Sequence, residues 1–195
     1  MSVVIAYKDE NGTVWMGADT QCGCGSDFKK SYTAKGNLKL LRLENGILLG
    51  RVGKLTQHQH AWAHPEWFTL PEDGCLTKAH IVTRILPRLV EHFKKQGFFE
   101  KEDDEPISMQ CAFLIAHGDR LFSIDDDLHV RTVAGSAAIG AGAPFVRLAM
   151  ARIDKQKPVE EELLRMLRLS ASCSPAVSAP FILMNTASDA CLQLS

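Results

Sequence analysis

The first hairpin of the chain decides the fold, and residues 2–20 carry it with the sequence SVVIAYKDENGTVWMGADT. Residues 3–7 are apolar at nearly every position, which is typical of a strand that is covered on both faces. The pair Asn11-Gly12 strongly favours a tight turn, and residues 13–20 then return to a strand pattern. The sequence therefore predicts a buried hairpin, with Ser2 at the mouth of the sheet that it joins.

Strand and helix patterns continue in separate blocks along the chain. A second hairpin is predicted around Asn45-Gly46, between residues 37–43 and 47–53. Residues 55–66 are ambiguous, whereas residues 78–95 carry apolar side chains at helical spacing, and Pro87 is expected to kink this helix. Three strands, two helices and two strands follow, at residues 108–117, 119–125, 128–135, 143–153, 158–168, 179–185 and 190–195.

This order of elements favours one class of fold. Hairpins that are segregated from helices are typical of an α+β fold and not of a doubly wound parallel sheet. Two apolar-faced antiparallel sheets with helices outside both give a four-layer αββα sandwich. A length of 195 residues suits one sizeable core, so we expect a single domain over residues 1–195.

The composition argues against several kinds of partner and site. The 22 basic and 23 acidic residues give a net charge of −1 without a basic run, which argues against nucleic acid binding. No apolar run reaches the length of a membrane span and no signal-peptide pattern is present, so we expect a cytoplasmic protein. In that compartment the 6 cysteines are expected to be reduced thiols, and we predict neither a cofactor nor a metal site.

Two groups of residues suggest binding motifs without completing them. His58, His60 and His64 lie close together, but on a helix only His60 and His64 share a face, so the geometry for three metal ligands is poor. We expect them to be exposed polar residues of a helix. The glycines of residues 135–142 lack the spacing of a nucleotide-binding loop and are expected to allow tight packing at a strand-to-helix turn.

Taken together, the segments resemble the proteasome β-subunit family of N-terminal nucleophile hydrolases, which includes the bacterial protease subunit HslV. The resemblance covers nearly the whole chain. It rests on the order and spacing of SVVIAYKDENGTVWMGADTQ, GNLKLLRLENGILLGRVG, LFSIDDDLHV, AAIGAGAPFVRLAMARI and APFIL. It implies the sandwich predicted above, and a peptidase subunit that cleaves polypeptide inside an oligomeric ring.

The resemblance also implies which residues form the catalytic site: Ser2, Asp19, Lys39 and Gly50. Ser2 matches the family's amino-terminal threonine nucleophile once Met1 is removed. Asp19 matches the acidic partner and Lys39 the lysine, with Lys35 as the alternative. Gly50 matches the glycine whose backbone N–H helps to form the oxyanion hole.

The chemistry of these residues is coherent. A free α-amino group has a pKa of about 7.7–8.0, so that of Ser2 can accept the proton of its own hydroxyl at neutral pH. Lys39 would lower the pKa of the hydroxyl and the amine, and Asp19 would orient the lysine and balance its charge. The backbone N–H of Gly50 would stabilise the oxyanion of the tetrahedral intermediate.

The sequence departs from the family around this site. Ser2 keeps the hydroxyl of the family's threonine but lacks the methyl group that restricts its rotamer. Ala141 stands where the family carries a serine. The family's late aspartate has no counterpart, and the candidates to replace it are Ser170, Ser172 and Ser174.

Three functions remain open from the sequence. The first is the ring peptidase, which implies a homo-oligomeric ring, a polypeptide substrate and a separate ATPase unfoldase, since this chain has no P-loop. The second is a catalytically silent ring or scaffold subunit. The third is a hydrolase of small amides that uses the same nucleophile.

Overall fold

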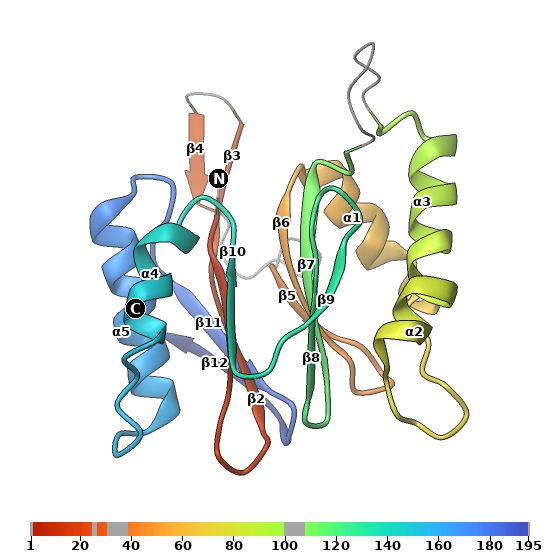
Figure 1. Ribbon diagram of the computed structural model, residues 1–195. Helices are drawn as coiled ribbons and strands as arrows, with labels where there is room; N and C mark the ends of the chain where they lie inside the picture. Colours follow the sequence, from red (N-terminus) through yellow and green to blue (C-terminus); the bar gives the residue numbers. More distant parts are fainter. Residues whose placement is uncertain (1, 25–26, 31–38, 100–107, 195) are drawn as a thin grey trace.

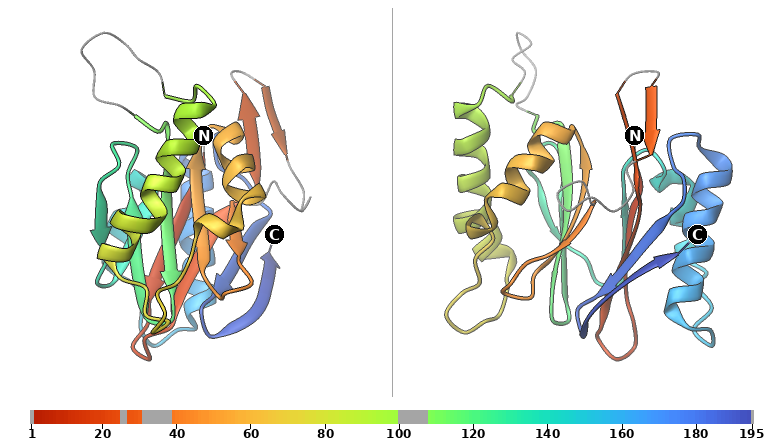
Figure 2. Two further views of the ribbon diagram at one scale, coloured as in Figure 1. Left: turned by 90° about the vertical axis from the view of Figure 1, so that its right-hand side faces the viewer. Right: turned by 180° about the vertical axis from the view of Figure 1, so that it is seen from behind.

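The chain folds into four layers, in which two antiparallel sheets lie face to face between two layers of helices (Figure 1). The computed structural model describes residues 2–24, 27–30, 39–99 and 108–194, and for residues 22–24 and 27–30 it describes the backbone alone. Views from the side and from behind show helices on the outer face of each sheet (Figure 2). The predicted α+β sandwich is confirmed.

Two sheets of 5 strands form the inner layers. The first has the order β10-β1-β2-β11-β12 and contains β1 (Val4–Lys8), β2 (Val14–Asp19), β10 (Ser136–Ile139), β11 (Phe181–Asn185) and β12 (Ser188–Leu194). The second has the order β5-β6-β7-β8-β9 and contains β5 (Leu40–Arg42), β6 (Leu48–Gly53), β7 (Cys111–His117), β8 (Arg120–Ile124) and β9 (Val130–Thr132). A separate hairpin of β3 (Gln21–Cys24) and β4 (Asp27–Lys30) follows β2.

The helices divide between the two outer faces (Figure 1). The second sheet is covered by α1 (Leu55–Ala63), the short turn η1 (Pro65–Trp67), and a continuous helix made of α2 (Lys78–His80), η2 (Ile81–Ile85) and α3 (Leu86–Lys95). The first sheet is covered by α4 (Ala143–Met150) and α5 (Val159–Cys173).

Three apolar cores lie between these four layers. The strand β1 contributes to two of them, which explains the run of apolar residues in its sequence. Val3, which precedes the strand, and Ile5 within it point to the core beneath α4 and α5. Val4 and Ala6 point to the core between the two sheets. Because successive side chains alternate between the faces of a strand, a strand that is covered on both sides needs apolar residues at every position.

Several predictions of local structure need correction. The hairpin of β3 and β4 and the strand β10 were not predicted, and in β10 only Ile139 among Ser136–Ile139 is a strong strand former. The helix of residues 78–95 is confirmed, and its wide π-type turn η2 ends two residues before Pro87. A proline has no N–H to donate and its ring crowds the carbonyl of the preceding turn, which accounts for the widened turn.

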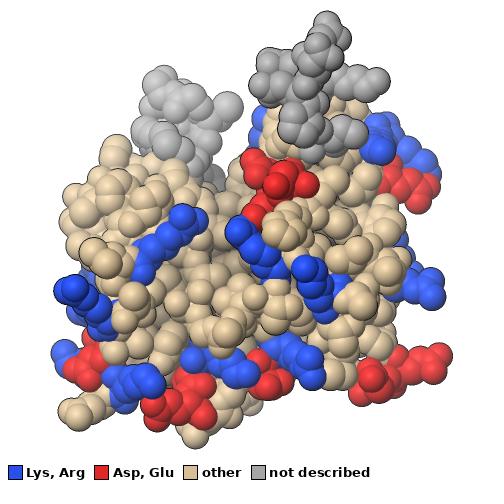
Figure 3. All heavy atoms as spheres, viewed as in Figure 1, with Lys and Arg blue, Asp and Glu red and all other residues tan. Residues whose placement is uncertain are grey.

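Basic and acidic side chains are interspersed over the face that Figure 3 shows. Among the described residues, no helix is long and apolar enough to span a membrane. Cys75, Cys111, Cys173 and Cys191 are free thiols, while the side chains of Cys22 and Cys24 lie outside the description.

A buried polar pair lies between α1 and the second sheet. Arg51 of β6 is 1% exposed, and its guanidinium donates a hydrogen bond to the backbone carbonyl of His58 in α1. The prediction that His58 is an exposed polar residue is wrong, because α1 lies on the sheet and turns this side chain inward. Burial lowers the pKa of His58 to about 4, and the neighbouring Arg51 charge acts in the same direction.

The first prediction concerns pH and stability. The folded-state pKa of His58 lies below the ordinary value of 6.5, so the neutral ring stabilises the fold above pH 6.5, and this contribution is lost as pH falls towards 4. At about 1.4 kcal/mol per unit, the loss is about 3 kcal/mol. Urea unfolding of wild type and His58→Gln between pH 7 and 4 measures the difference, with His129→Gln, at an exposed position, as the matched control. Equal pH dependence in all three proteins contradicts it.

Candidate active site

A buried ion pair joins the two sheets at one end of the sandwich. Asp19 is the last residue of β2 in the first sheet, and Lys39 directly precedes β5 in the second. The Lys39 Nζ atom lies 2.7 Å from Asp19 Oδ1, and the two side chains are 4% and 0% exposed. The sequence offered Lys39 and Lys35 as alternative partners of Asp19. Lys39 makes the contact, and Lys35 lies outside the described residues.

The carboxylate of Asp19 is held next to Ser2 by backbone groups. The N–H of Val3 donates to Asp19 Oδ1 at 2.9 Å, and the N–H of Gln21 donates to Oδ2 at 3.2 Å. Burial raises the pKa of the Asp19 carboxyl, while the Lys39 ammonium and then the two amides act in the opposite direction. The carboxylate charge therefore depends on these three donors.

Ser2 is itself fixed through its carbonyl group. The N–H of Gly142 donates to the Ser2 oxygen at 3.1 Å, and the Ser2 side chain is buried. Gly140 has a φ of +93°, and a Cβ atom there would lie 2.3 Å from the Ser2 oxygen. Glycine is required at this position because both the conformation and the contact exclude a side chain.

The glycine-rich turn also reaches α5. The hydroxyl of Ser170, which is 0% exposed, donates to the carbonyl of Gly142 at 3.2 Å. A Cβ atom on Gly142 would lie 2.3 Å from that hydroxyl. Tight packing is thus confirmed for Gly140 and Gly142, whereas a Cβ atom on Gly135 would meet nothing within 4 Å, and this residue precedes β10.

The three serines that could replace the family's late aspartate occupy different environments. Ser170 touches the turn that holds Ser2, as described above. Ser172 is exposed and donates to the carbonyl of Leu169 at the surface. Ser174 is buried and accepts from the N–H of Ala176. Ala141 is exposed, and Ser170 is the serine whose hydroxyl donates to the turn that holds Ser2.

The register of the second sheet does not leave the Gly50 amide free. Arg51 N donates to the carbonyl of Lys39 on one side of β6, and Lys54 N donates to that of Gln110 on the other. Hydrogen-bonding groups alternate between the two sides of an antiparallel strand. The Gly50 N–H therefore points to β7, where Gly50 is opposite Leu114. A Cβ atom on Gly50 would lie 2.6 Å from Val4 Cγ1, so this glycine permits the close packing of the sheets.

Gly53, which the sequence analysis does not single out, differs from Gly50 in the direction of its N–H. By the same alternation its N–H faces the side of β6 on which β5 lies, and it is the last residue of the strand. Its φ is +120°, and it follows Val52, whose Cγ1 would lie 3.0 Å from the Cβ atom that Gly140 lacks. That same Cβ position touches the Ser2 oxygen, so Gly53 lies beside the end of the chain that carries Ser2.

No family model matches the sequence, and no curated protein matches it. Solved structures do match over nearly the whole chain. BPH from Thiobacillus denitrificans, in complex with epoxomicin, superposes with a TM-score of 0.72 at 18% identity and covers 100% of both chains. The chain therefore has the N-terminal nucleophile hydrolase fold.

Two further solved structures, from other organisms, share this fold. Eukaryotic HslV from Trypanosoma brucei has a TM-score of 0.65 at 16% identity, and the match covers 94% of this chain and 98% of that one. Anbu from Pseudomonas aeruginosa, solved as a helical assembly, has a TM-score of 0.67 at 12% identity, with coverage of 94% and 80%. At such identities the N-terminal nucleophile hydrolase fold is shared, and activity has to be argued from the site.

The second prediction tests the ion pair. Lys39→Met leaves the Asp19 carboxylate buried without its cation, so we expect a loss of about 3–5 kcal/mol in the free energy of unfolding. The double variant Asp19→Asn with Lys39→Met removes both charges, and most of that loss is recovered. Urea unfolding of the two single variants and the double variant gives the coupling energy. Additive losses would show that the two charges do not interact.

The third prediction tests whether Gly50 is needed for the close packing of β6 against Val4. Gly50→Ala forces a methyl group against Val4, so we expect a loss of about 1–3 kcal/mol in the free energy of unfolding. Adding Val4→Ala makes room for this methyl group and restores part of the stability, as thermal unfolding would show. If the second substitution makes the protein less stable still, the clash is not the cause.

Proposed function

We propose that this chain is a peptidase subunit whose nucleophile is the hydroxyl of Ser2, exposed as the first residue by removal of Met1. The observation that carries the proposal is the link from Lys39 through Asp19 to the N–H of Val3, the residue next to Ser2. Burying a lysine and an aspartate is costly unless they are paired, and this pair is bonded to the N–H of the residue that follows Ser2.

The reaction proceeds in two steps. The Ser2 hydroxyl attacks the carbonyl carbon of a peptide bond, and its proton passes to the free α-amino group of Ser2. The tetrahedral intermediate collapses when the C–N bond breaks, and the leaving amine takes the proton from the α-ammonium group. The resulting ester on Ser2 is then attacked by water, with the α-amine again accepting and returning the proton, which releases the acid and restores the hydroxyl.

Each of the other groups has one task in this reaction. The ammonium group of Lys39 lowers the pKa of the amine and the hydroxyl, and Asp19 holds it in place. We assign the oxyanion to the backbone N–H of Gly53 and not to that of Gly50, because the Gly50 amide points to β7. Gly142 fixes the Ser2 carbonyl, and Ser170 supports Gly142.

We propose in addition that the subunit works within a homo-oligomer in the cytoplasm, on polypeptide that a separate ATPase unfolds. Support for self-association comes from apolar side chains that the isolated chain leaves exposed. Leu148 of α4 is 70% exposed, Phe145 lies one turn away, and Leu55 and Trp62 of α1 are exposed on the opposite layer. Anbu, with the same fold, is described as a helical assembly.

The fourth prediction tests the nucleophile. The protein is released from a cleavable amino-terminal fusion so that Ser2 is its first residue, and its matched control keeps one extra residue before Ser2. A peptide epoxyketone, which needs both the hydroxyl and the free amine, labels the first form and leaves the control unlabelled, as intact mass shows. Ser2→Ala abolishes turnover of fluorogenic peptides, and Ser2→Thr retains it. Lys39→Met lowers it by about 100-fold or more.

The alternatives predict different outcomes. Absence of labelling in a folded protein with Ser2 as its first residue would favour the silent ring subunit and overturn the peptidase proposal. Labelling without turnover of any peptide, together with hydrolysis of small amides, would favour the small-amide hydrolase. Turnover that survives Ser2→Ala would remove Ser2 from the mechanism altogether.

A further inference from the structure

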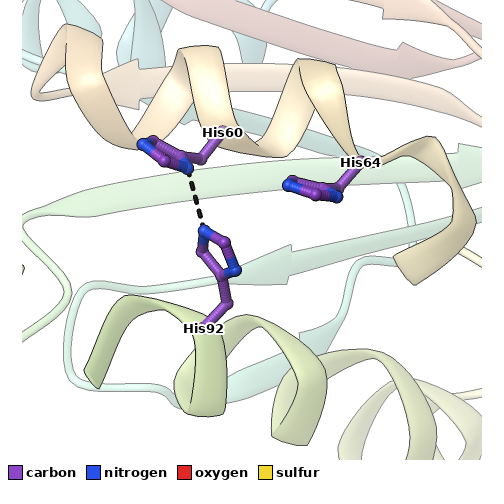
Figure 4. A group of neighbouring side chains, drawn as sticks. All are labelled: His60, His64 and His92. Carbon is purple, nitrogen blue, oxygen red and sulfur yellow. Dashed lines mark hydrogen bonds between the residues drawn. The ribbon is translucent and has the colours of Figure 1, made fainter. Parts of the chain in front are cut away.

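Three histidine side chains converge on the outer face of the second sheet, outside the site described above (Figure 4). His60 comes from α1, His64 is the residue that ends this helix, and His92 comes from α3. One ring nitrogen from each side chain lies within 4.8 Å of those of the other two. All three rings are partly exposed, so an ion could reach them from solvent.

The helices explain this convergence. His60 and His64 are four residues apart and therefore share one face of α1. That face is turned towards α3, which brings in His92 as the third ring (Figure 4). The prediction that these histidines are simply exposed is wrong for His60 and His64, because α3 covers their face and leaves both only partly exposed.

The separations suit a metal ion. A zinc ion binds imidazole nitrogens at about 2.0–2.1 Å in a tetrahedral arrangement, which places two ligand nitrogens about 3.3 Å apart. His92 Nε2 lies 2.8 Å from His60 Nδ1, and the group spans at most 4.8 Å. Small changes in the side-chain torsions bring all three nitrogens to ligand distance. The proton in the His60–His92 hydrogen bond moves to the other nitrogen of its own ring when the ion binds, because a neutral imidazole coordinates a metal through its unprotonated nitrogen.

Surrounding groups already orient the rings. His64 Nδ1 lies 2.8 Å from the carboxylate of Glu66, so this nitrogen donates its proton to Glu66 and leaves Nε2 with its lone pair. Trp67 stacks on His64 with ring centroids 4.4 Å apart, and Phe98 meets the edge of His60 at 5.0 Å. A ligand histidine supported by a carboxylate is a common arrangement around zinc.

We propose that His60, His64 and His92 bind a divalent transition metal ion of the zinc class, with the remaining position open to water. Imidazole ligands favour zinc, copper, nickel or cobalt over magnesium or calcium, whose preferred ligands are oxygen atoms. The ion joins α1 to α3. Because α1 begins directly after β6, it also braces the strand that ends at Gly53. The site is independent of the function proposed for Ser2.

The fifth prediction tests this site with zinc itself. The full-length protein, without a histidine tag and stripped with a chelator, is titrated with Zn²⁺ by calorimetry. We expect one ion per chain and a rise of several degrees in Tm that grows with zinc concentration. His92→Phe keeps a ring in the cluster but lowers the zinc affinity by at least about 100-fold, and Glu66→Gln lowers it by about 10–100-fold.

Controls separate this site from other histidines and from packing effects. His129→Ala, an exposed histidine outside the cluster, retains wild-type affinity. Co²⁺ gives the visible absorption bands of a tetrahedral site in wild type and in His129→Ala, and not in His92→Phe. No binding by the folded wild-type protein, or equal binding by His92→Phe and wild type, overturns the proposal and leaves the three rings as a packed aromatic cluster.

Discussion

Burying a charged lysine or aspartate between two sheets is very costly unless an opposite charge compensates it, and this requirement fixes the arrangement at one end of the sandwich. Asp19 belongs to the first sheet and Lys39 to the second, so the 2.7 Å contact holds only when the sheets face each other in one register. The Val3 and Gln21 amides complete the donors to the carboxylate. The position of Ser2, the turn after β2 and the start of β5 all depend on this pair.

The sequence alone predicted much of this arrangement, for physical reasons that particular residues show. A strand as apolar as residues 3–7 had to be covered on both faces, and turns with Asn-Gly had to join antiparallel strands. Those two constraints lead to a sandwich of hairpins between helices. Lys39 within an apolar segment was a further signal, since a buried lysine needs a partner.

Other features depend on which residues lie opposite one another, and no local pattern reveals them. Gly50 and Gly53 are equally plausible glycines in the sequence, and only the alternation of hydrogen bonds along β6 shows which amide points to β7. His92 lies on a different helix from His60 and His64, so the spacing of the first two could not indicate a third ring. Ser170 reaches the Ser2 carbonyl only through Gly142, a contact between distant segments.

The peptide group between Ser2 and Val3 is anchored at both of its polar atoms. Its oxygen accepts from the N–H of Gly142, and its nitrogen donates to Asp19. Both anchors lie on the carboxyl side of Ser2, so they hold whether the serine nitrogen is an amide or an amine. On the mechanism proposed for Ser2, cleavage before this residue would convert an inert precursor into an active enzyme by a change of one functional group, without the refolding that many zymogens undergo.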